Sequence, residues 1–272
     1  MPSKLTLLFL GDVVGRAGRQ LLLTYLPPLV KKVKSNLTIV NIENIAGGKG
    51  PNLRVMEEIE DLPIDVYTTG SHFFDQKEFV SSWEHFPRVI RPANYPEGNP
   101  GYDHYTLDLP GGEKVTVLQL MGRTFMYALA CPFAMADDLI KRFSRTGPII
   151  IDFHAEATSE KTAFGHYVDG RVSAVLGTHT HIPTADETIL PGGTAYITDA
   201  GMVGAYDGVI GFKKDIIIEK FLMQTPRRFE PANGRPRMSA VVVTMDSKKP
   251  LAYSIQRFFV SSEEDIESLI LS

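Results

Sequence analysis

Polar residues follow successive short apolar segments of the chain, each at the point where a segment ends. Asp12 follows Leu5–Leu10, and Glu43 follows Leu37–Ile42. In open α/β sheets, ligand sites lie outside the carboxyl ends of the strands, so side chains placed in this way are expected to share one site. The residues at such ends are Asp12, Glu43, Asn44, Ser71, His72, Asn94, Asp152, His154, His179, His181 and Asp199.

The mixture of carboxylates and imidazoles is typical of a transition-metal site. His154, His179 and His181 offer nitrogen, and Asp12 and Glu43 offer oxygen, a mixture that favours Zn, Mn or Fe over Ca. His179 and His181 are two residues apart, so in an extended chain they face the same side and can ligate two neighbouring ions. Two such ions, about 3.5–4 Å apart, would hold a phosphoryl group and generate a hydroxide nucleophile.

Several of these residues also have ordinary structural explanations. Asp12, taken alone, fits a turn or N-cap residue before a helix. Asp152 is explained equally well as a structural carboxylate and as a residue that supports metal ligands from behind. Asp199 fits a turn. The pair His179 and His181 differs from these, because Thr-His-Thr-His directly follows an apolar segment.

Glycines at the first predicted strand-to-helix junction suggest a different class of protein. Gly11, Gly15 and Gly18 follow the pattern G-x-x-x-G-x-x-G, whereas a dinucleotide-binding fold requires G-x-G-x-x-G. Asp12 would also place a negative charge where a pyrophosphate approaches. A dinucleotide-binding oxidoreductase is therefore the weaker hypothesis, and the glycine-rich segment 47–50 does not have the spacing of a Walker loop.

The elements expected to position these residues alternate between strand and helix in the first third of the chain. This alternation predicts a largely parallel sheet. The predicted strands are Leu5–Leu10, Leu37–Ile42, Val66–Thr69 and Arg88–Ile90, and the predicted helices are Arg16–Val33, Val55–Leu62 and Gln76–His85.

The rest of the chain predicts two hairpins and a further set of strands. The first hairpin joins 104–109 to 114–120 through Pro110-Gly111-Gly112, and the second joins 239–245 to 251–259. The segment 216–223 fits either a helix or a strand. The remaining expectations are a helix at 135–143, strands at 149–153, 172–176 and 195–198, and long loops at 92–101 and 226–236.

Composition limits the class of protein and its partners. With 272 residues, of which 43% are hydrophobic, the chain can form one large core, and a single domain over residues 1–272 is expected. A net charge of -4 argues against binding to duplex nucleic acid. No apolar run approaches the roughly 20 residues of a membrane span, and the single cysteine, Cys131, predicts a cytoplasmic protein.

Eight motifs together resemble one known family over nearly the whole chain. They are similar to the YmdB-type branch of the calcineurin-like metallophosphoesterases. The motifs are L-G-D-V-V-G at 10–15, N-I-E-N at 41–44, G-S-H at 70–72, R-P-A-N at 91–94, G-R-T-F at 122–125, D-F-H-A-E-A-T-S-E-K at 152–161, G-T-H-T-H at 177–181 and G-T-A-Y-I-T-D at 193–199.

The resemblance implies a fold, an activity and a metal centre. The fold is a four-layer α/β/β/α sandwich of two mixed sheets, and the activity is hydrolysis of small phosphodiesters, with 2′,3′-cyclic nucleotides the expected class. Two divalent or trivalent metal ions are implied, with Fe or Mn favoured and Zn or Mg also compatible. By position, Asp12, Glu43 and His181 would hold one ion, and Glu43 would bridge to a second ion that His154 and His179 also bind.

The resemblance also suggests roles for the remaining residues. Asn44 would add a ligand, and His72 would protonate the leaving alkoxide or orient the phosphate. Arg123 and Asn94 are predicted to bind the substrate, with Arg123 stabilising charge on the phosphoryl oxygens. The hypothesis is in-line attack by a hydroxide that bridges the two ions. The oligomeric state, including a homo-oligomer, stays open.

One position departs from the family pattern. The family has Gly-Asn-His where this chain has Gly70-Ser71-His72. A Ser hydroxyl is shorter than an Asn side chain and is usually a weaker ligand, so Ser71 is expected to weaken or alter the second metal site without abolishing it. The alternative hypothesis is a regulatory protein of low activity that binds metal and nucleotide.

Overall fold

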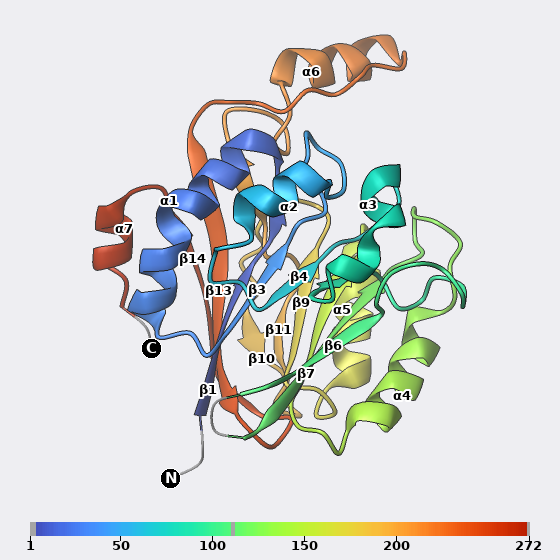
Figure 1. Ribbon diagram of the computed structural model, residues 1–272, viewed down its shortest axis with the longest axis vertical. Helices are drawn as coiled ribbons and strands as arrows, with labels where there is room; N and C mark the ends of the chain where they lie inside the picture. Colours follow the sequence, from blue (N-terminus) through green and yellow to red (C-terminus); the bar gives the residue numbers. More distant parts are fainter. Residues whose placement is uncertain (1–3, 110–111, 271–272) are drawn as a thin grey trace.

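Two β-sheets lie face to face in the middle of the molecule, with helices on their outer faces (Figure 1). The computed structural model describes residues 4–109 and 112–270. Within that part, the first sheet has the order β2-β12-β13-β1-β3-β4-β5, with β14 paired to β13. Its strands are β1 (Lys4–Leu10), β2 (Asp12–Val13), β3 (Leu37–Asn41), β4 (Val66–Thr68), β5 (Val89–Ile90), β12 (Met202–Ala205), β13 (Pro236–Asp246) and β14 (Ala252–Val260).

The second sheet has the order β10-β11-β9-β8-β7-β6. Its inner strands run parallel, and the edge strands β6 and β10 are antiparallel to their neighbours. In the first sheet β1, β3, β4 and β5 are parallel, but β13 is antiparallel to β1, so both sheets are mixed. The second-sheet strands are β6 (His104–Asp108), β7 (Lys114–Met121), β8 (Ile149–His154), β9 (Ala174–Thr178), β10 (Thr188–Ile189) and β11 (Ala195–Ile197).

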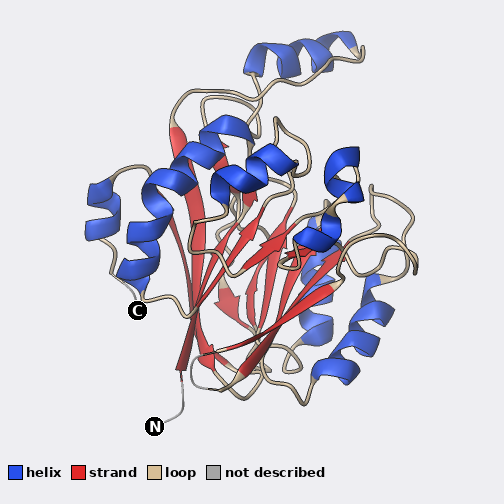
Figure 2. Ribbon diagram, in the orientation of Figure 1, coloured by secondary structure: helices blue, strands red, loops and turns tan. Residues whose placement is uncertain are grey.

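Helices cover the outer face of each sheet (Figure 2). Helices α1 (Gly15–Val33), α2 (Leu53–Ile59) and α7 (Glu263–Glu267) pack on the first sheet, and α4 (Pro132–Phe143) and α5 (Thr158–Val168) pack on the second. Helix α3 (Lys77–Ser81) and a 3₁₀ turn, η1 (Trp83–His85), lie between β4 and β5 in the chain, and α6 (Lys214–Met223) follows β12. The predicted four-layer sandwich is confirmed.

Three apolar layers hold the sandwich together. One lies between the two sheets, and one lies between each sheet and its helices. Strand β1 shows why its last four residues are all apolar: Leu7 and Phe9 face the other sheet, whereas Leu8 and Leu10 face the helices. A strand buried on both faces has no solvent-facing position, so a continuous apolar run replaces the usual alternation.

Most predicted elements are present, and the exceptions have physical causes. The helix predicted over 76–85 is broken into α3 and η1, because Ser82 leaves the helical conformation. Helix α5 was not predicted, since its buried face is Lys161, Phe164, Gly165 and Val168 and offers no apolar stripe. The strands on either side of Pro110-Gly111 pair antiparallel as expected, although those two residues lie outside the described part.

The ambiguous segment 216–223 and the C-terminal region are both helical. In α6 Ile217 is the buried residue, while Phe221, Leu222 and Met223 are exposed. The apolar residues therefore follow neither the helical period of about 3.6 residues nor the strand period of two. Helix α7 starts at a capping box between Ser262 and Asp265. Over the described residues, no helix combines the length and apolarity that crossing a membrane requires.

Candidate metal centre

Strands from both sheets end at one place and bring the acids and histidines together there. Asp12 follows β1 and Glu43 follows β3, both in the first sheet, whereas His154 ends β8 in the second sheet. His154 Nε2 lies 3.3 Å from Glu43 Oε1, and His154 Nδ1 lies 4.0 Å from Asp12 Oδ1. The site therefore spans the seam between the two sheets.

Asp12 carries an oxygen that the protein does not satisfy. Its Oδ2 accepts the backbone N–H of His179 at 3.1 Å, but Oδ1 is buried and has no hydrogen-bond partner among the described residues. Burial raises the pKa of Asp12, and the nearby His181 and His154 oppose that increase. Because a buried, unpaired carboxylate oxygen is costly, this position fits a bound cation.

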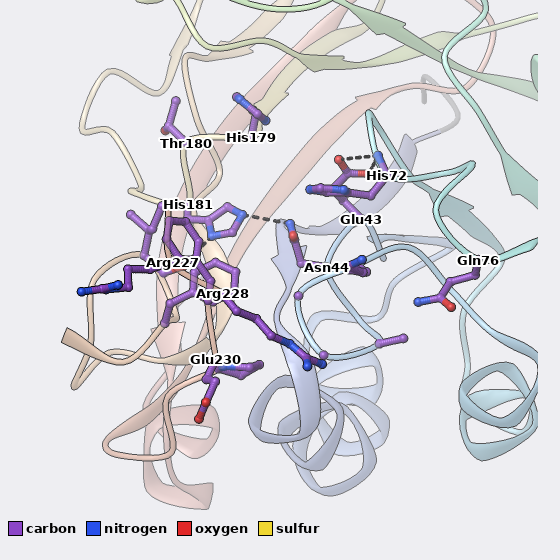
Figure 3. Close-up of a pocket in the computed structure, with 18 of the residues that line it drawn as sticks. Glu43, Asn44, His72, Gln76, His179, Thr180, His181, Arg227, Arg228 and Glu230 are labelled. Carbon is purple, nitrogen blue, oxygen red and sulfur yellow. Dashed lines mark hydrogen bonds between the residues drawn. The ribbon is translucent and has the colours of Figure 1, made fainter. Parts of the chain in front are cut away.

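Glu43 is the acceptor at the centre of the cluster. It accepts Ser71 Oγ–H at 2.8 Å and the His72 backbone N–H at 3.0 and 3.1 Å (Figure 3). Burial by itself would raise the pKa of Glu43, but His154, His72 and Ser71 stabilise the charged form, and the net effect is a lowered pKa. Glu43 is thus held as a carboxylate with both oxygens directed into the cluster.

Gly70 lets these groups approach one another. A Cβ at this position would lie 2.5 Å from His154 Nε2 and 2.7 Å from the Glu43 carboxyl carbon. Both distances are shorter than a non-bonded contact allows. The glycine that precedes Ser71 is therefore required by the closeness of two site residues from different sheets.

His179 and His181 lie on a turn whose backbone is unusual. Their φ angles are +98° and +65°, a region that residues other than glycine rarely adopt. Such strain is found at functional sites, where the surrounding structure enforces it. Burial, together with the neighbouring His154 and Lys161, lowers the pKa of His179 to about 2, so its imidazole is neutral and one of its ring nitrogens keeps a lone pair.

His181 is oriented by a carbonyl group. Its Nδ1 donates to the Ile210 carbonyl at 2.8 Å, which leaves Nε2 as the nitrogen with a lone pair. That Nε2 lies 3.8 Å from Asp12 Oδ1 and 3.0 Å from Asn44 Nδ2 (Figure 3). A hydrogen bond that fixes the tautomer in this way is typical of metal-ligating histidines.

His154 is oriented by a buried chain of hydrogen bonds. Thr178 Oγ donates to Asp152 at 2.6 Å, so the Thr178 oxygen accepts from His154 Nδ1 at 2.9 Å. Burial raises the pKa of Asp152 to about 6. Asn41 of the first sheet donates to the same carboxylate at 2.8 Å, which ties the two sheets together behind the site. Asp152 therefore supports a site residue from behind.

A buried ion pair holds the turn that carries the other two histidines. Lys161 Nζ donates to Asp199 Oδ2 and to the Thr178 carbonyl, both at 2.6 Å. Asp199 in turn accepts the Thr180 backbone N–H at 3.1 Å. In the sequence Asp199 fitted only a turn and Lys161 had no predicted role, yet together they fix the backbone between β9 and His181.

The nearest donor atoms of the cluster are in direct contact with one another. Among residues 4–109 and 112–270, no three His, Cys, Asp or Glu side chains surround a point closely enough to form a complete coordination shell. The nearest donor pairs are instead in direct contact: His179 Nδ1 lies 3.1 Å from His154 Nε2, and His154 lies 3.3 Å from Glu43. Two ligands at about 2.1 Å from one ion lie roughly 3.0–3.5 Å apart, so these spacings fit metal binding after small side-chain adjustments.

A cleft of about 1310 Å³ opens directly onto the cluster (Figure 3). His72 stands at its side, half exposed, and its Nδ1 pairs with Asp75 at 2.8 Å. His179 and Glu156 also reach the cleft and lie 3.1 Å apart. The predicted residues that line the cleft are Glu43, Asn44, His72, His179 and His181; Asp12, Ser71 and His154 contact them from behind.

Two predicted substrate-binding residues lie elsewhere. Asn94 is buried, and its amide is fully used on the Met121 backbone and the Ala130 carbonyl. Arg123 lines a separate, shallow depression, where Glu160 holds its backbone N–H. Neither residue lines the cleft that contains the acids and histidines.

One wall of the cleft was missed in the sequence. The segment 226–236 was described only as a long loop, but Arg227, Arg228 and Phe229 line the cleft together with Lys49 and Phe212. Two adjacent arginines, Arg227 and Arg228, are evident in the sequence. They did not indicate the site, because Arg227 comes 46 positions after His181 and only the fold brings the two segments together.

Comparison with known proteins identifies relatives across nearly the full length. The family model described as "YmdB-like protein" matches residues 8–258. A 2′,3′-cyclic-nucleotide 2′-phosphodiesterase of Bacillus subtilis strain 168 is 45% identical over 258 residues, which cover 94% of this chain and 97% of that protein.

Solved structures agree with that match. A phosphatase of Mycoplasma pneumoniae superimposes with a TM-score of 0.90 at 31% identity, covering 96% of this chain and 94% of the other. A hypothetical protein of Thermus thermophilus superimposes with a TM-score of 0.88 at 38% identity, covering 94% and 99%. The fold, the order of its elements and the sequence thus match the same group of proteins.

Proposed function

The chain belongs to the YmdB-like protein family, and on that premise we propose that it is a metal-dependent phosphodiesterase. Its substrates are small phosphodiesters, with 2′,3′-cyclic nucleotides the favoured class, as in the B. subtilis relative. Hydrolysis takes place in the cleft where the carboxyl ends of β1, β3, β4, β8 and β9 meet. Within the proposal the whole chain, residues 1–272, acts as one domain in the cytoplasm, and duplex nucleic acid is not a partner.

The buried Asp12 Oδ1 is the observation that carries this proposal. It has no hydrogen-bond donor within the described chain, yet the imidazoles of His181 and His154 lie 3.8 and 4.0 Å away. A hydrogen-bonded structural carboxylate would use both oxygens. An oxygen kept free between two imidazoles is better explained as a ligand.

The same cluster offers donors for two ions. Asp12, Glu43 and His181 would hold the first, and Glu43, His154 and His179 would hold the second, with Asn44 beside His181. Carboxylate, amide and imidazole donors without a thiolate suit Zn, Mn or Fe, and the family resemblance favours Fe or Mn. When bound, such ions supply the positive charge that activates water and neutralises the phosphoryl oxygens.

His72 serves as the proton donor to the leaving oxygen. It faces the cleft, and Asp75 at 2.8 Å orients its ring through Nδ1. The opposite nitrogen is then the one available to the substrate. Its backbone N–H meanwhile holds Glu43, so the same short turn positions a proposed ligand and the proposed acid.

Asp12→Asn tests the proposal directly. We expect hydrolysis of 2′,3′-cyclic AMP to fall by at least about 10²-fold, because the neutral amide weakens a metal site that supplies much of the catalysis. The steady-state rate and the bound metal are measured on the same preparation. Asp61→Asn, which alters an exposed acid outside the cleft, is the matched control and retains both. Full activity of the Asp12 variant would refute the proposal.

A second function is favoured by one contact. Ser71 Oγ donates to Glu43 Oε1 at 2.8 Å, and so occupies an oxygen that a second ion would use. A protein with a weakened second site would bind metal and nucleotide but hydrolyse little, which suits a regulatory role. Every other ligand position matches the family pattern in the sequence, so we propose the enzyme as the primary function.

A further inference from the structure

An arm of the chain forms one wall of the cleft. It comprises residues 214–229, that is α6 and the segment that follows, and Figure 1 shows α6 projecting beyond the body of the molecule. Its two ends are joined by backbone hydrogen bonds from Lys213 N to Glu230 O at 2.9 Å and from Ala232 N to Gly211 O at 2.8 Å. The Lys213–Glu230 ion pair at 2.6 Å reinforces this junction.

The arm brings two arginines to the cleft, and they differ in their contacts. Arg227 is paired with Glu219 of α6 and extends away from the side of the cleft that holds Glu43. Arg228 extends toward that side in Figure 3. It is exposed, and within the described residues it has no ion pair, hydrogen bond or ring contact.

A second cation with free hydrogen-bond donors lines the same cleft. Lys49 lies on the loop that follows Glu43 and Asn44; it is exposed, and its ammonium group has no ion-pair or hydrogen-bond partner in the described chain. The acids that line the cleft have other contacts: Glu230 pairs with Lys213, and Glu156 lies 3.1 Å from the neutral imidazole of His179. Lys49 and Arg228 are therefore left as available positive charges beside the proposed reaction site.

We propose that Lys49 and Arg228 form a subsite for a second phosphate of the substrate, separate from the phosphodiester that is cleaved. The inference rests on the proposed function and makes its substrate class more specific. The preferred substrate is a nucleotide with a 2′,3′-cyclic phosphate and an additional phosphate on its 5′ oxygen. That chemistry occurs in a free 5′-phosphorylated nucleotide and at the cyclic-phosphate end of a short oligoribonucleotide.

The size and charge of the cleft support this assignment. Its volume of about 1310 Å³ exceeds the roughly 300–1,000 Å³ typical of small-molecule pockets, so there is space beyond one cyclic nucleotide. A guanidinium provides a planar fork of donors that matches phosphate oxygens, and an ammonium provides a point charge. Lys49 and Arg228 lie on different loops that line one cleft, and two cations there suit a phosphate that can carry two negative charges, as a terminal 5′-phosphate does.

The test compares substrates that differ by one phosphate. For the native protein, kcat/KM is measured with 2′,3′-cyclic AMP, with its 5′-phosphorylated form, and with a dinucleotide ending in 2′,3′-cyclic phosphate. We expect the 5′-phosphate to raise kcat/KM about tenfold or more, because hydrogen bonds to charged groups are strong. A higher kcat/KM for the dinucleotide than for the 5′-phosphorylated nucleotide would identify an RNA end as the source of this chemistry; a higher value for the 5′-phosphorylated nucleotide would identify the free nucleotide.

The variant Lys49→Ala/Arg228→Ala shows which residues provide the preference. We expect the ratio of the two nucleotide values to fall toward one, and the steepness of its salt dependence to fall with it. Lys31→Ala/Arg145→Ala, which removes two exposed cations outside the cleft, is the matched control and keeps the native ratio. Far-ultraviolet circular dichroism verifies folding of each variant.

The outcomes separate this inference from the proposed function. Hydrolysis of 2′,3′-cyclic AMP without any gain from the 5′-phosphate overturns the subsite and leaves the phosphodiesterase intact. If the 5′-phosphate still raises kcat/KM in the Lys49→Ala/Arg228→Ala variant, the assignment to these two residues is overturned. If neither nucleotide is hydrolysed, the proposed function fails, and equilibrium binding of the same pair to the native protein and the variant decides whether the subsite exists.

Discussion

At the residue scale, the site depends on which atoms are left without partners. Asp12 Oδ1 has no hydrogen-bond partner in the described part of the chain, whereas its neighbours are held: His181 by Ile210, His154 by Thr178, and Glu43 by Ser71 and His72. The sequence predicted these side chains because each follows an apolar strand. It did not predict that a Ser71 hydroxyl would bind Glu43, since that contact joins loops 28 residues apart.

Ser71→Asn tests how far this serine weakens the second metal site. We expect tighter binding of the second ion and a rise in turnover of up to about tenfold, because an amide oxygen is a better ligand than a hydroxyl already donated to Glu43. Metal titration and steady-state hydrolysis are the measurements. Ser71→Ala, which removes the hydroxyl without adding a ligand, is the control.

The size of the change in turnover in Ser71→Asn distinguishes the phosphodiesterase from the regulatory protein of low activity. An inactive native protein that gains activity by several orders of magnitude in Ser71→Asn would establish the regulatory alternative. Unchanged metal binding and turnover would show that the serine is a sufficient substitute for the amide. The first of these results is the one that contradicts the enzyme proposed for the native chain.

At the element scale, helix α5 shows why part of the site could not be predicted. Its Lys161 is almost fully buried, with 1% of its surface exposed, and reaches Asp199 beneath the turn that carries His179 and His181. From the sequence alone, a lysine in a short helix is expected to lie on the surface. The strands, by contrast, were predictable, because burial on both faces makes them continuously apolar.

Lys161→Met tests this ion pair. We expect the free energy of unfolding to fall by about 3–5 kcal/mol, because removing one partner leaves a buried charge on Asp199 uncompensated. Chemical denaturation gives the value. Lys114→Met, which breaks an exposed pair with Asp108, is the control and costs at most about 1 kcal/mol.

Lys161→Met also tests whether the ion pair positions the turn that carries the two histidines, apart from its effect on stability. Asp199 holds the Thr180 backbone N–H, so its displacement moves the turn between the two histidines. Under conditions where Lys161→Met stays folded, we expect its metal affinity to fall by about 10–100-fold. A variant as stable as the native protein, with native metal affinity, would show that the pair has neither role.

At the scale of the whole molecule, the site exists because two sheets meet. Asp12 and Glu43 lie at the ends of strands in one sheet, whereas His154 ends a strand of the other sheet and is followed in the site by the turn after β9 that carries His179 and His181. The pattern of apolar segments predicted one largely parallel sheet, and the resemblance to a known family supplied the second sheet. The arm over the cleft was missed by both, since neither periodicity nor spacing shows which strand ends a distant loop will cover.

Metal content, measured together with activity, tests the central claim most directly. Protein purified without chelator is analysed for bound Fe, Mn and Zn, then stripped, and its hydrolysis of 2′,3′-cyclic AMP is followed as Mn²⁺ or Fe²⁺ is returned. The account predicts about two ions per chain, loss of hydrolysis on stripping, and recovery that tracks occupancy of the site. Hydrolysis that continues at its full rate in metal-free protein would contradict it.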